Sequence, residues 1–401
     1  MMDWWLIEPH DPLIVRDGRP FGPTPGARAR PLDFPFPSTI AGGVRTRAGQ
    51  KDGAFDTSKI DQVKEVGIRG PLLVELDDND QPTFLVPAPG DALLIEDEEK
   101  GVVRHRLRPL DPEDALSDMP DQMPPVGLVK PDLRKPYKKA PRFWYWQQFE
   151  KWLVSPPEGE EVVNPSGLGH NGPGKEWRVH VKMDPATFTG EEGGLFATGG
   201  LEFFHKPEGE ERRLSVVKRL ALATAVAENP HNLSIAETFA PLGGERRMMR
   251  WHKAEKWHKA EKTLEMPDGL AKQIAQSGFC RVILLTPAYF EAGWKPDWLL
   301  QPQYGVAVTL ETAVVSKYQT VSGWDFEKRG PKPTRRLVPA GSVFYLTLAG
   351  DETARQDWAR AMWLANMSDT EDDRLAGFGL AALGVWDGKV SQIIVEEDKN
   401  G

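Results

Sequence analysis

Cysteine is almost absent from this sequence: its 401 residues contain one, Cys280, so no disulfide can form within the chain. Hydrophobic runs long enough to cross a membrane are also lacking, and the first residues are acidic where a signal peptide is basic. An unpaired thiol suits a reducing compartment, and Cys280 in the hydrophobic stretch 279–285 is expected to be inert core. We therefore expect a cytoplasmic protein without membrane contact.

Residue patterns typical of catalysis or metal binding are scarce as well. The eight histidines show no zinc-ligand spacing. Residues 167–172 match G-x-G-x-x-G, but Pro173 removes an N–H group, and a strand-like pattern follows where a phosphate-binding loop requires a helix. We interpret residues 167–175 as a mobile glycine loop, and we expect no cofactor, no metal and no enzymatic activity.

Charge is distributed unevenly along the chain. The net charge of −9 argues against a protein that coats nucleic acid over its whole surface. Residues 75–121 are strongly acidic, whereas residues 130–151 and 246–262 are rich in Lys and Arg. The basic stretches either form a local nucleic-acid groove or are ordinary solvated surface.

Strand-like segments outnumber helix-like ones, and the helices come singly between groups of strands. Helices are predicted over residues 39–48, 143–153, 248–264 and 353–366. This alternation predicts an α+β fold with antiparallel sheets rather than a doubly wound parallel sheet.

A six-residue repeat lies within the third predicted helix, since Trp251–Lys256 recurs identically as residues 257–262. We interpret it as an exposed, charged helical connector and place a domain boundary in or just after it. His252 with Glu255 has the i, i+3 spacing that can serve a metal on a helix, but the second copy points another way, which favours a solvated helix.

Residues 8–49 carry the strongest local pattern. A strand is predicted at residues 13–16, followed by the tight-turn pair Asp17-Gly18. Pro37 with Ser38 and Thr39 is typical of a capped helix start. The helix that follows has one apolar face, at positions 40, 44 and 48.

The same helix contains Gly42 and Gly43, each of which costs about 1 kcal/mol relative to alanine. Such glycines indicate close approach to the helix by another element or by a ligand. Free N–H groups from Ser38 to Ala41, beside Arg45 and Arg47, would suit a phosphate. Alternatively, the glycines serve packing and the arginines are solvated; the residues alone do not decide between the two.

Several stretches together resemble one known family, the RAMP subunit that holds the 5′ tag of the crRNA in type III-B (Cmr) CRISPR complexes. Residues 8–22 and 34–49 resemble its N-terminal signature. Four later stretches are similar to it in the same order: residues 178–196, the L-G-G-E-R-R stretch 242–247, residues 338–346, and the glycine-rich loop in residues 377–384.

This resemblance implies two ferredoxin-like (modified RNA-recognition) domains packed together, with helices on one face of each sheet. We expect an N-terminal domain with insertions over residues 1–250, the connector at 251–274, and a C-terminal domain at 275–401. The resemblance also implies the partners: the crRNA tag, target RNA near it, the large polymerase-like subunit and the backbone RAMP subunits.

The expected role is therefore a non-catalytic scaffold that grips the crRNA tag. One alternative is a metal-independent endonuclease that processes repeat RNA with His10 or His170 as base. A second is a purely protein-binding assembly module. The residues expected to bind RNA are Arg16, Arg19, Ser38, Thr39, Ala41, Gly42, Arg45, Arg47, His170, Arg246, Arg247, Gly377, Phe378 and Gly379.

Overall fold

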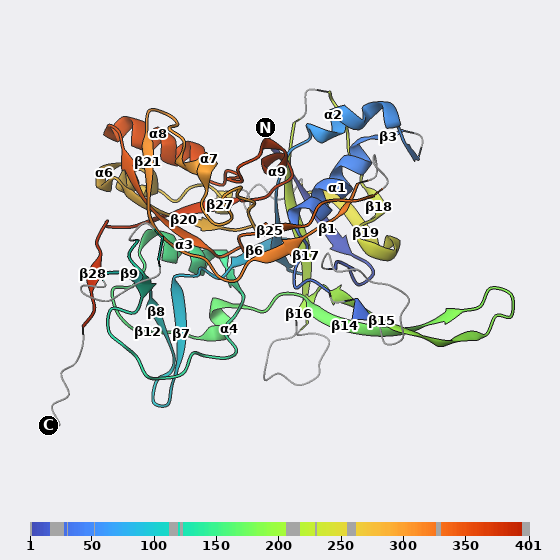
Figure 1. Ribbon diagram of the computed structural model, residues 1–401, viewed down its shortest axis with the longest axis horizontal. Coiled ribbons are helices and arrows are strands. Elements are labelled where there is room, and N and C mark those ends of the chain that lie inside the picture. Colours follow the sequence, from blue (N-terminus) through green and yellow to red (C-terminus); the bar gives the residue numbers. More distant parts are fainter. Residues whose placement is uncertain are drawn as a thin grey trace.

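A large antiparallel sheet organises the first two thirds of the chain in this computed structural model (Figure 1). The structure describes residues 2–16, 28–29, 31–51, 53–111, 119–120, 123–205, 217–228, 231–254, 262–325 and 330–394. Among these residues the sheet has nine strands. Their order is β13 (Gly169–His170), β11 (Phe143–Tyr145), β6 (Pro82–Pro87), β5 (Ile68–Leu76), β17 (Lys218–Ala227), β1 (Met2–Pro9), β19 (Met248–Lys253) and β18 (Thr238–Pro241), and β16 (Phe204–His205) pairs with β17.

Four strands of this sheet are arranged in a different order across the sheet than along the chain. Along the chain they follow one another as β1, β5, β17 and β19, but across the sheet β1 lies between β17 and β19, with β5 beyond β17. Helix α1 (Pro37–Ala48) comes between β1 and β5 in the chain. It buries Ile40 and Val44 in one core with Ile7 and Leu222 of the sheet, so the apolar helix face predicted from the sequence is confirmed.

The C-terminal third forms a second antiparallel sheet with the same strand order. The order across it is β21 (Ala307–Val314), β26 (Val343–Ala349), β20 (Phe279–Leu284) and β27 (Ala381–Val385). Helices α6 (Leu270–Ser277) and α8 (Glu352–Met362) pack on each other and on one face of this sheet. They bury Ile274 and Trp358, and α8 corresponds to the helix predicted over residues 353–366.

The other faces of the two sheets share a single hydrophobic core. Leu72 and Val74 of β5 belong to it together with Val343 and Tyr345 of β26. Helix α3 (Trp146–Val154) fills this interface with its aromatic side chains, of which Trp146, Phe149 and Trp152 are fully buried. The helix predicted over residues 143–153 therefore begins three residues late, because residues 143–145 pair with β6 as strand β11.

Smaller sheets are inserted between β5 and β17. The inserted elements are β7 (Ala92–Asp97), β8 (Gly101–Arg106), β9 (Arg108–Asp111), β10 (Val126–Gly127), β12 (Glu161–Val162), α4 (Pro165–Leu168), β14 (Gly174–Met183) and β15 (Gly190–Glu202). Strand β28 (Ser391–Gln392) pairs with β9, and β2 (Arg28–Ala29) pairs with β15. Figure 1 shows the β14–β15 hairpin extending far from the body, and it leaves Trp177 and Phe188 exposed at its surface.

The remaining elements are short. They are β3 (Gln50–Lys51), β4 (Ala54–Phe55), η1 (Thr57–Lys59), α2 (Ile60–Lys64), η4 (Gly244–Arg246), α7 (Asp297–Leu300), β22 (Gln319–Val321), β23 (Trp324–Asp325), β24 (Gly330–Pro331), β25 (Arg335–Leu337) and α9 (Glu371–Leu375). The predicted α+β class with mainly antiparallel sheets is confirmed. None of the helices in the described part of the chain is both long and apolar enough to cross a bilayer.

Two predictions of local structure are wrong. Residues 13–16 form no strand and make only isolated bridges, from Leu13 to Leu201 and from Arg16 to Pro31. Residues 248–253 are not helical but form β19, which pairs with both β1 and β18 and buries Met249 and Trp251 on one side. Pairing on both edges outweighs the local helical pattern there.

The predicted charged helical connector therefore does not begin at residue 251, and α6, which overlaps the end of the predicted connector, starts at Leu270. His252 lies in a strand, where its Nε2 is 2.8 Å from Oε1 of Glu8, so the helical metal pair is not formed. Glu255 and most of the second repeat copy lie outside the described residues.

Candidate nucleic-acid interface

The chain leaves β1 in an extended arm, residues 10–16, that packs on the loop between β18 and β19. The backbone N–H groups of His10 and Asp11 donate to the carbonyl oxygen of Met248, at 3.1 and 3.3 Å. Further along, the N–H of Gly244 donates to the carbonyl oxygen of Ile14 at 2.7 Å. The arm and the loop, which are more than 200 residues apart in sequence, are thus joined through their backbones.

The loop, residues 242–247, adopts a conformation that favours glycine. Gly243 has φ +72°, and a Cβ there would lie 2.5 Å from the carbonyl oxygen of Ile14. Glu245 and Arg246 also have positive φ, 54° and 51°, although neither is glycine. Non-glycine residues with positive φ are held in that conformation by their surroundings and are frequent at functional sites.

This loop brings basic side chains next to the arm. Arg246 is exposed, and Arg247 is mostly buried and donates to Oε2 of Glu245 at 2.8 Å. Arg16 is exposed two residues beyond Ile14, the arm residue that contacts the loop. Three of the arginines predicted to bind RNA therefore lie on one pair of joined segments. Arg19 lies outside the described residues.

Helix α1 approaches the same loop through one of its glycines. A Cβ on Gly43 would lie 2.8 Å from Cδ1 of Leu242 and 2.9 Å from Cη2 of Trp251, whereas a Cβ on Gly42 would meet nothing within 4 Å. Gly43 therefore serves close packing between α1 and the β18–β19 strand pair. Gly42 is exposed and faces open space.

The start of α1 differs from the prediction. The helix begins at Pro37 with Phe36 as N-cap, and no side chain makes the capping bond. Ser38 and Thr39 lie inside the first turn, half-buried, and the N–H of Thr39 donates to the carbonyl oxygen of Phe36 at 3.0 Å. Ala41 is buried, so its side chain faces the core. The first turn contains no acidic residue that would repel a phosphate.

Arg45 and Arg47 are not solvated arginines. Nε of Arg45 donates to the carbonyl oxygen of Val66 at 3.3 Å, and burial lowers the pKa of its guanidinium. Arg47 is 5% exposed; its guanidinium lies over the ring of Trp251, 5.0 Å from the centroid, and donates to the carbonyl oxygen of Ala236. Arg47 thus ties α1 to the sheet, and its side chain is withdrawn from the surface.

The glycine-rich loop at Gly377–Gly379 lies elsewhere, where the two sheets meet. Both glycines have positive φ, and a Cβ on Gly377 would lie 2.7 Å from the carbonyl oxygen of Gly70. Phe378 is buried in the same core as α1. All three residues, which were predicted to bind RNA, are buried, and close packing accounts for the glycines.

His170 is also buried, which corrects its prediction as a mobile loop residue. A Cβ on Gly169 would lie 1.9 Å from the carbonyl oxygen of Phe143, so this glycine lets β13 pair with β11. The His170 ring stacks on His205, with centroids 4.0 Å apart, and its Nε2 lies 3.8 Å from Oε2 of Glu75 without a hydrogen bond. Burial and the neighbouring His205 lower the pKa of His170 to about 3.

The endonuclease alternative gains no geometric support from these histidines. His170 is neutral at physiological pH but cannot reach a substrate from its buried position. His10 is exposed, and its ring meets the edge of Phe239 at 5.7 Å between centroids. No hydrogen bond from its ring to a carboxylate occurs among the described residues.

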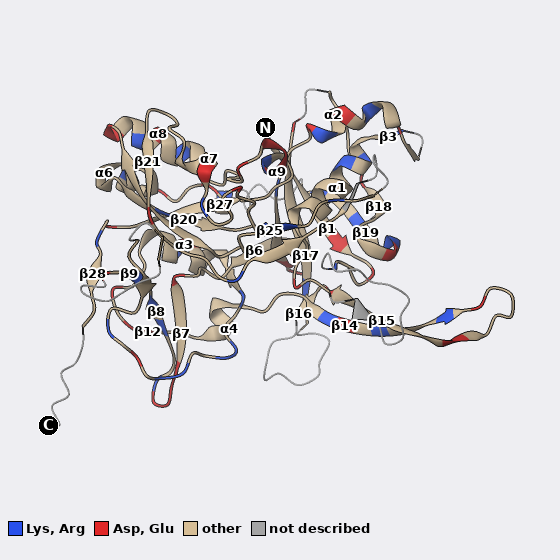
Figure 2. Cartoon of the chain, viewed as in Figure 1, with Lys and Arg blue, Asp and Glu red and all other residues tan. Residues whose placement is uncertain are grey.

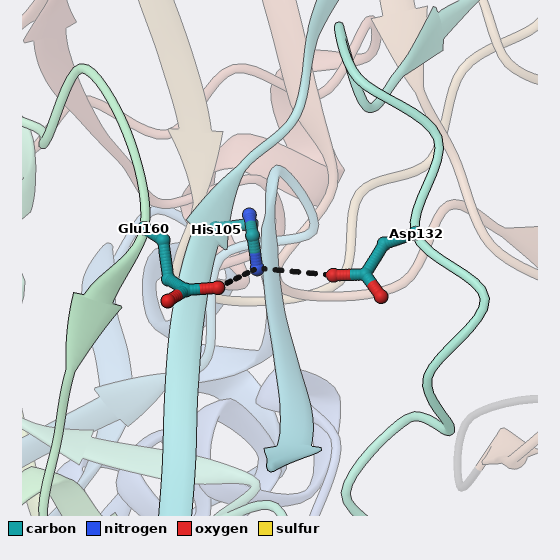
Figure 3. Close-up of side chains that lie close together, drawn as sticks. All are labelled: His105, Asp132 and Glu160. Carbon is teal, nitrogen blue, oxygen red and sulfur yellow. Dashed lines mark ion pairs between the residues drawn. The ribbon is translucent and has the colours of Figure 1, made fainter. Parts of the chain in front are cut away.

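Sequence reasoning missed a cluster of ionisable groups in the insertion, His105, Asp132 and Glu160 (Figure 3). Nε2 of His105 lies 3.6 Å from Asp132 and 3.7 Å from Glu160. Arg134 donates to both carboxylates, and its hydrogen bonds lower the pKa of Asp132 to about 2. Lys100 also pairs with Glu160, at 2.6 Å, so two cations of the chain balance the two carboxylates, and one arginine of the basic 130–151 stretch is used internally.

In the view of Figure 2, Lys and Arg are interspersed with Asp and Glu over both halves of the described chain. The local pair Asp132–Arg134 is visible in the sequence, but His105 and Glu160 join it only through the fold.

Comparison with known proteins identifies the family. The model of the family described as CRISPR-associated protein (Cas_Cmr3) matches residues 5–386. A chain of the type III-B Cmr-beta complex bound to cognate target RNA and AMPPnP, state 1, is 14% identical, with a TM-score of 0.45 over 85% of this chain and 86% of that one. A chain of the same complex bound to cognate target RNA gives 15% identity and a TM-score of 0.45, with the same coverage.

A comparison with curated protein sequences gives no match. The family match covers the N-terminal signature and all four later stretches on which the resemblance was based. The resemblance read from the sequence is thereby confirmed, and the chain belongs to the Cas_Cmr3 family of CRISPR-associated proteins.

Proposed function

We propose that this chain is the non-catalytic crRNA-binding scaffold subunit of a cytoplasmic type III-B (Cmr) CRISPR effector complex. In this role it grips the repeat-derived 5′ tag of the crRNA and joins the large polymerase-like subunit to the backbone subunits. Membership of the Cas_Cmr3 family supports the assignment to a CRISPR effector.

One observation carries the RNA-gripping part of the proposal: the joint between the arm and the 242–247 loop. The bond from Gly244 to Ile14 holds Arg16 and Arg246, both exposed, on adjoining segments of rigid backbone. Positive φ at Glu245 and Arg246 fixes the direction in which the Arg246 side chain leaves the loop. Preorganised arginines suit phosphate groups, because their charge is permanent and little side-chain freedom is lost on binding.

The start of α1 adds neutral donors to this surface. Ser38 and Thr39 offer hydroxyl groups in a first turn without acidic residues, where the helix dipole favours a negative charge. In this arrangement the RNA is held by its backbone. Cleavage would require a base paired with an acid. His10 is exposed on the arm, but no hydrogen bond from its ring to a carboxylate occurs among the described residues.

We further propose that the chain is built of two ferredoxin-like units, close to the expected ranges 1–250 and 275–401. Because β19 belongs to the first sheet and α6 packs on the second, the first unit extends to Lys253 and the second begins at Leu270. The strand order β5-β17-β1-β19 and the order β21-β26-β20-β27 both correspond to second, third, first and fourth along the chain. In the second unit α7 follows the first strand and α8 precedes the last, which gives the β-α-β-β-α-β sequence of this fold.

The grip is tested by removing the two exposed arginines. The Arg16→Gln/Arg246→Gln variant of the full chain should bind tag RNA about 10- to 100-fold more weakly, because two charge-assisted phosphate contacts are lost. The slope of log K against log salt should also become shallower by about 1.4, since each lost contact with single-stranded RNA contributes about 0.7. Fluorescence anisotropy at several salt concentrations measures both quantities.

A charge-matched control is Lys272→Gln/Arg360→Gln, which removes two exposed cations from α6 and α8. It should leave affinity and slope unchanged. If the arginine variant also binds like the wild type, these two arginines do not hold the RNA and the grip is contradicted. If neither protein binds tag RNA, the purely protein-binding alternative is supported. Site-specific cuts in repeat RNA that disappear in His10→Ala would instead establish the endonuclease.

A further inference from the structure

A small hairpin of the C-terminal half, β22 with β25, is anchored on one side and open on the other. Val321 and Leu337 on its inner side are buried in the same core as α1. Arg335, paired with Val321 in the register, makes two hydrogen bonds of 2.8 Å to the carboxylate of Asp373 and lies over the ring of Tyr289 at 4.4 Å. The hairpin is therefore held firmly against the body.

Its outer side presents an aromatic ring and a guanidinium group together. Arg336 pairs with Thr320 in the register, so its side chain points away from the core. The guanidinium lies 4.6 Å from the ring centroid of Tyr318, and Tyr318 is 48% exposed. We call Tyr318 and Arg336 the hairpin platform.

No ion pair among the described residues neutralises the charge of the platform. Arg336 and the exposed neighbours Lys317 and Lys332 take part in no ion pair in the described part of the chain, unlike Arg335 on the inner side. Lys317 adjoins Tyr318 in the chain, whereas Lys332 bonds to Gly323 toward the other end of the hairpin, so the two lysines lie on either side of the platform along the strands. A partner that supplies both negative charge and a flat apolar surface would complement this arrangement.

Single-stranded nucleic acid supplies both. An unpaired base stacks on a tyrosine ring or an arginine plane, and the adjoining phosphates pair with nearby cations. An acidic peptide would satisfy the cations but would leave the ring without a stacking partner. We propose that the hairpin platform stacks one unpaired base of single-stranded RNA, with Arg336 and Lys317 at the adjoining phosphates and Lys332 at a phosphate further along the hairpin.

This inference rests on the proposed function and adds a second contact point to it. The platform hairpin and α1 share one core. Arg335 of the hairpin bonds to Asp373 of α9, and the adjacent Asp372 interacts electrostatically with Arg45 of α1. The exposed carboxylates of Glu371 and Asp372 begin α9. They interrupt the basic surface, so we treat the platform as a separate contact and not as a continuous groove.

The test uses the full chain and fluorescently labelled tag RNA. Tyr318→Leu should weaken binding about 5- to 150-fold, the range that loss of one base stack produces, with an unchanged salt slope. Tyr318→Phe retains the ring and should bind within about twofold of the wild type. Arg336→Gln should make the salt slope shallower by about 0.7. The matched control is Tyr304→Leu, which removes another exposed tyrosine, located before β21.

A second set of RNAs identifies the stacked base. Each RNA carries one abasic nucleotide, moved along the tag. The wild type should lose affinity at one position, and Tyr318→Leu should be insensitive at that same position, since the two changes remove the same contact. Losses that add independently at every position would overturn the inference.

The outcomes separate the two proposals. Wild-type affinity in Tyr318→Leu, combined with weak binding by Arg16→Gln/Arg246→Gln, overturns the platform and leaves the proposed function intact. Failure of the wild-type chain to bind RNA overturns both. Unchanged RNA affinity in Tyr318→Leu together with loss of co-assembly with a neighbouring subunit would assign the platform to an acidic protein partner instead.

Discussion

His170 combines three features that make its charge state sensitive to folding. It is buried, it stacks on His205, and it lies near Glu75 without a hydrogen bond to it. Its pKa in the folded chain is about 3, compared with about 6.5 for an unperturbed histidine. Between these two values the unfolded chain binds a proton that the folded chain does not, so stability falls as the pH is lowered through this window.

We predict that this residue makes the free energy of unfolding fall by on the order of 2 kcal/mol between about pH 7 and about pH 5. His170→Gln cannot take up the proton and should reduce the pH-dependent loss by that amount. Urea unfolding of both proteins at the two pH values measures the difference. His10→Gln, at an exposed position, should retain the wild-type pH dependence; an equal loss in His170→Gln would contradict the assignment.

At the scale of one element, α1 contains a natural pair of test positions. Gly42 and Gly43 are adjacent in sequence, but only Gly43 faces a neighbouring element. The cost of a helical glycine is the same at both positions, whereas the cost of an added methyl group differs. The pair therefore separates helix propensity from close packing.

Gly42→Ala should raise the free energy of unfolding by up to about 1 kcal/mol, since alanine removes the backbone entropy penalty and its Cβ meets open space. Gly43→Ala should lower it by about 1–3 kcal/mol, because Leu242 and Trp251 must move. Denaturant titrations of the two variants provide the comparison. Stabilisation by Gly43→Ala would show that α1 does not pack closely on the β18–β19 pair.

For the whole molecule, a buried ion pair links the insertion to the C-terminal sheet. Arg281 of β20 and Asp91 are both fully buried and bonded to each other. Arg281 also donates to the carbonyl oxygens of Trp152, at 2.7 Å, and Val385, at 2.9 Å, while Nε1 of Trp152 donates to Asp91 at 2.9 Å. The two halves therefore share one polar network inside an otherwise apolar interface.

Removing one member of this network leaves an unpaired buried charge. Arg281→Met should lower the free energy of unfolding by about 3–5 kcal/mol, because Asp91 loses its counter-ion. Arg281→Met/Asp91→Asn should be more stable than Arg281→Met, since asparagine removes the charge and can still accept from Trp152. A double-mutant cycle measured by denaturant unfolding checks the order. A less stable double variant would contradict an electrostatic origin.

The sequence by itself determined the features that depend on local pattern. Antiparallel strands with single helices, the apolar face of α1, and family membership all follow from short stretches in order along the chain. Side-chain periodicity sets which face of an element is buried, and this periodicity is visible without knowledge of neighbours. That is why Ile40, Val44 and Trp358 were placed correctly.

Only the tertiary structure decided which residues are exposed and which strands pair. Residues 248–253 have helical charge spacing, but partners on both edges make them a strand. His170, Arg47 and Phe378 suggested RNA contacts in the sequence, yet packing against distant segments buries them. The arm and the 242–247 loop meet through backbone groups, which carry no sequence signature. The hairpin platform depends on the register between β22 and β25, which the sequence does not specify.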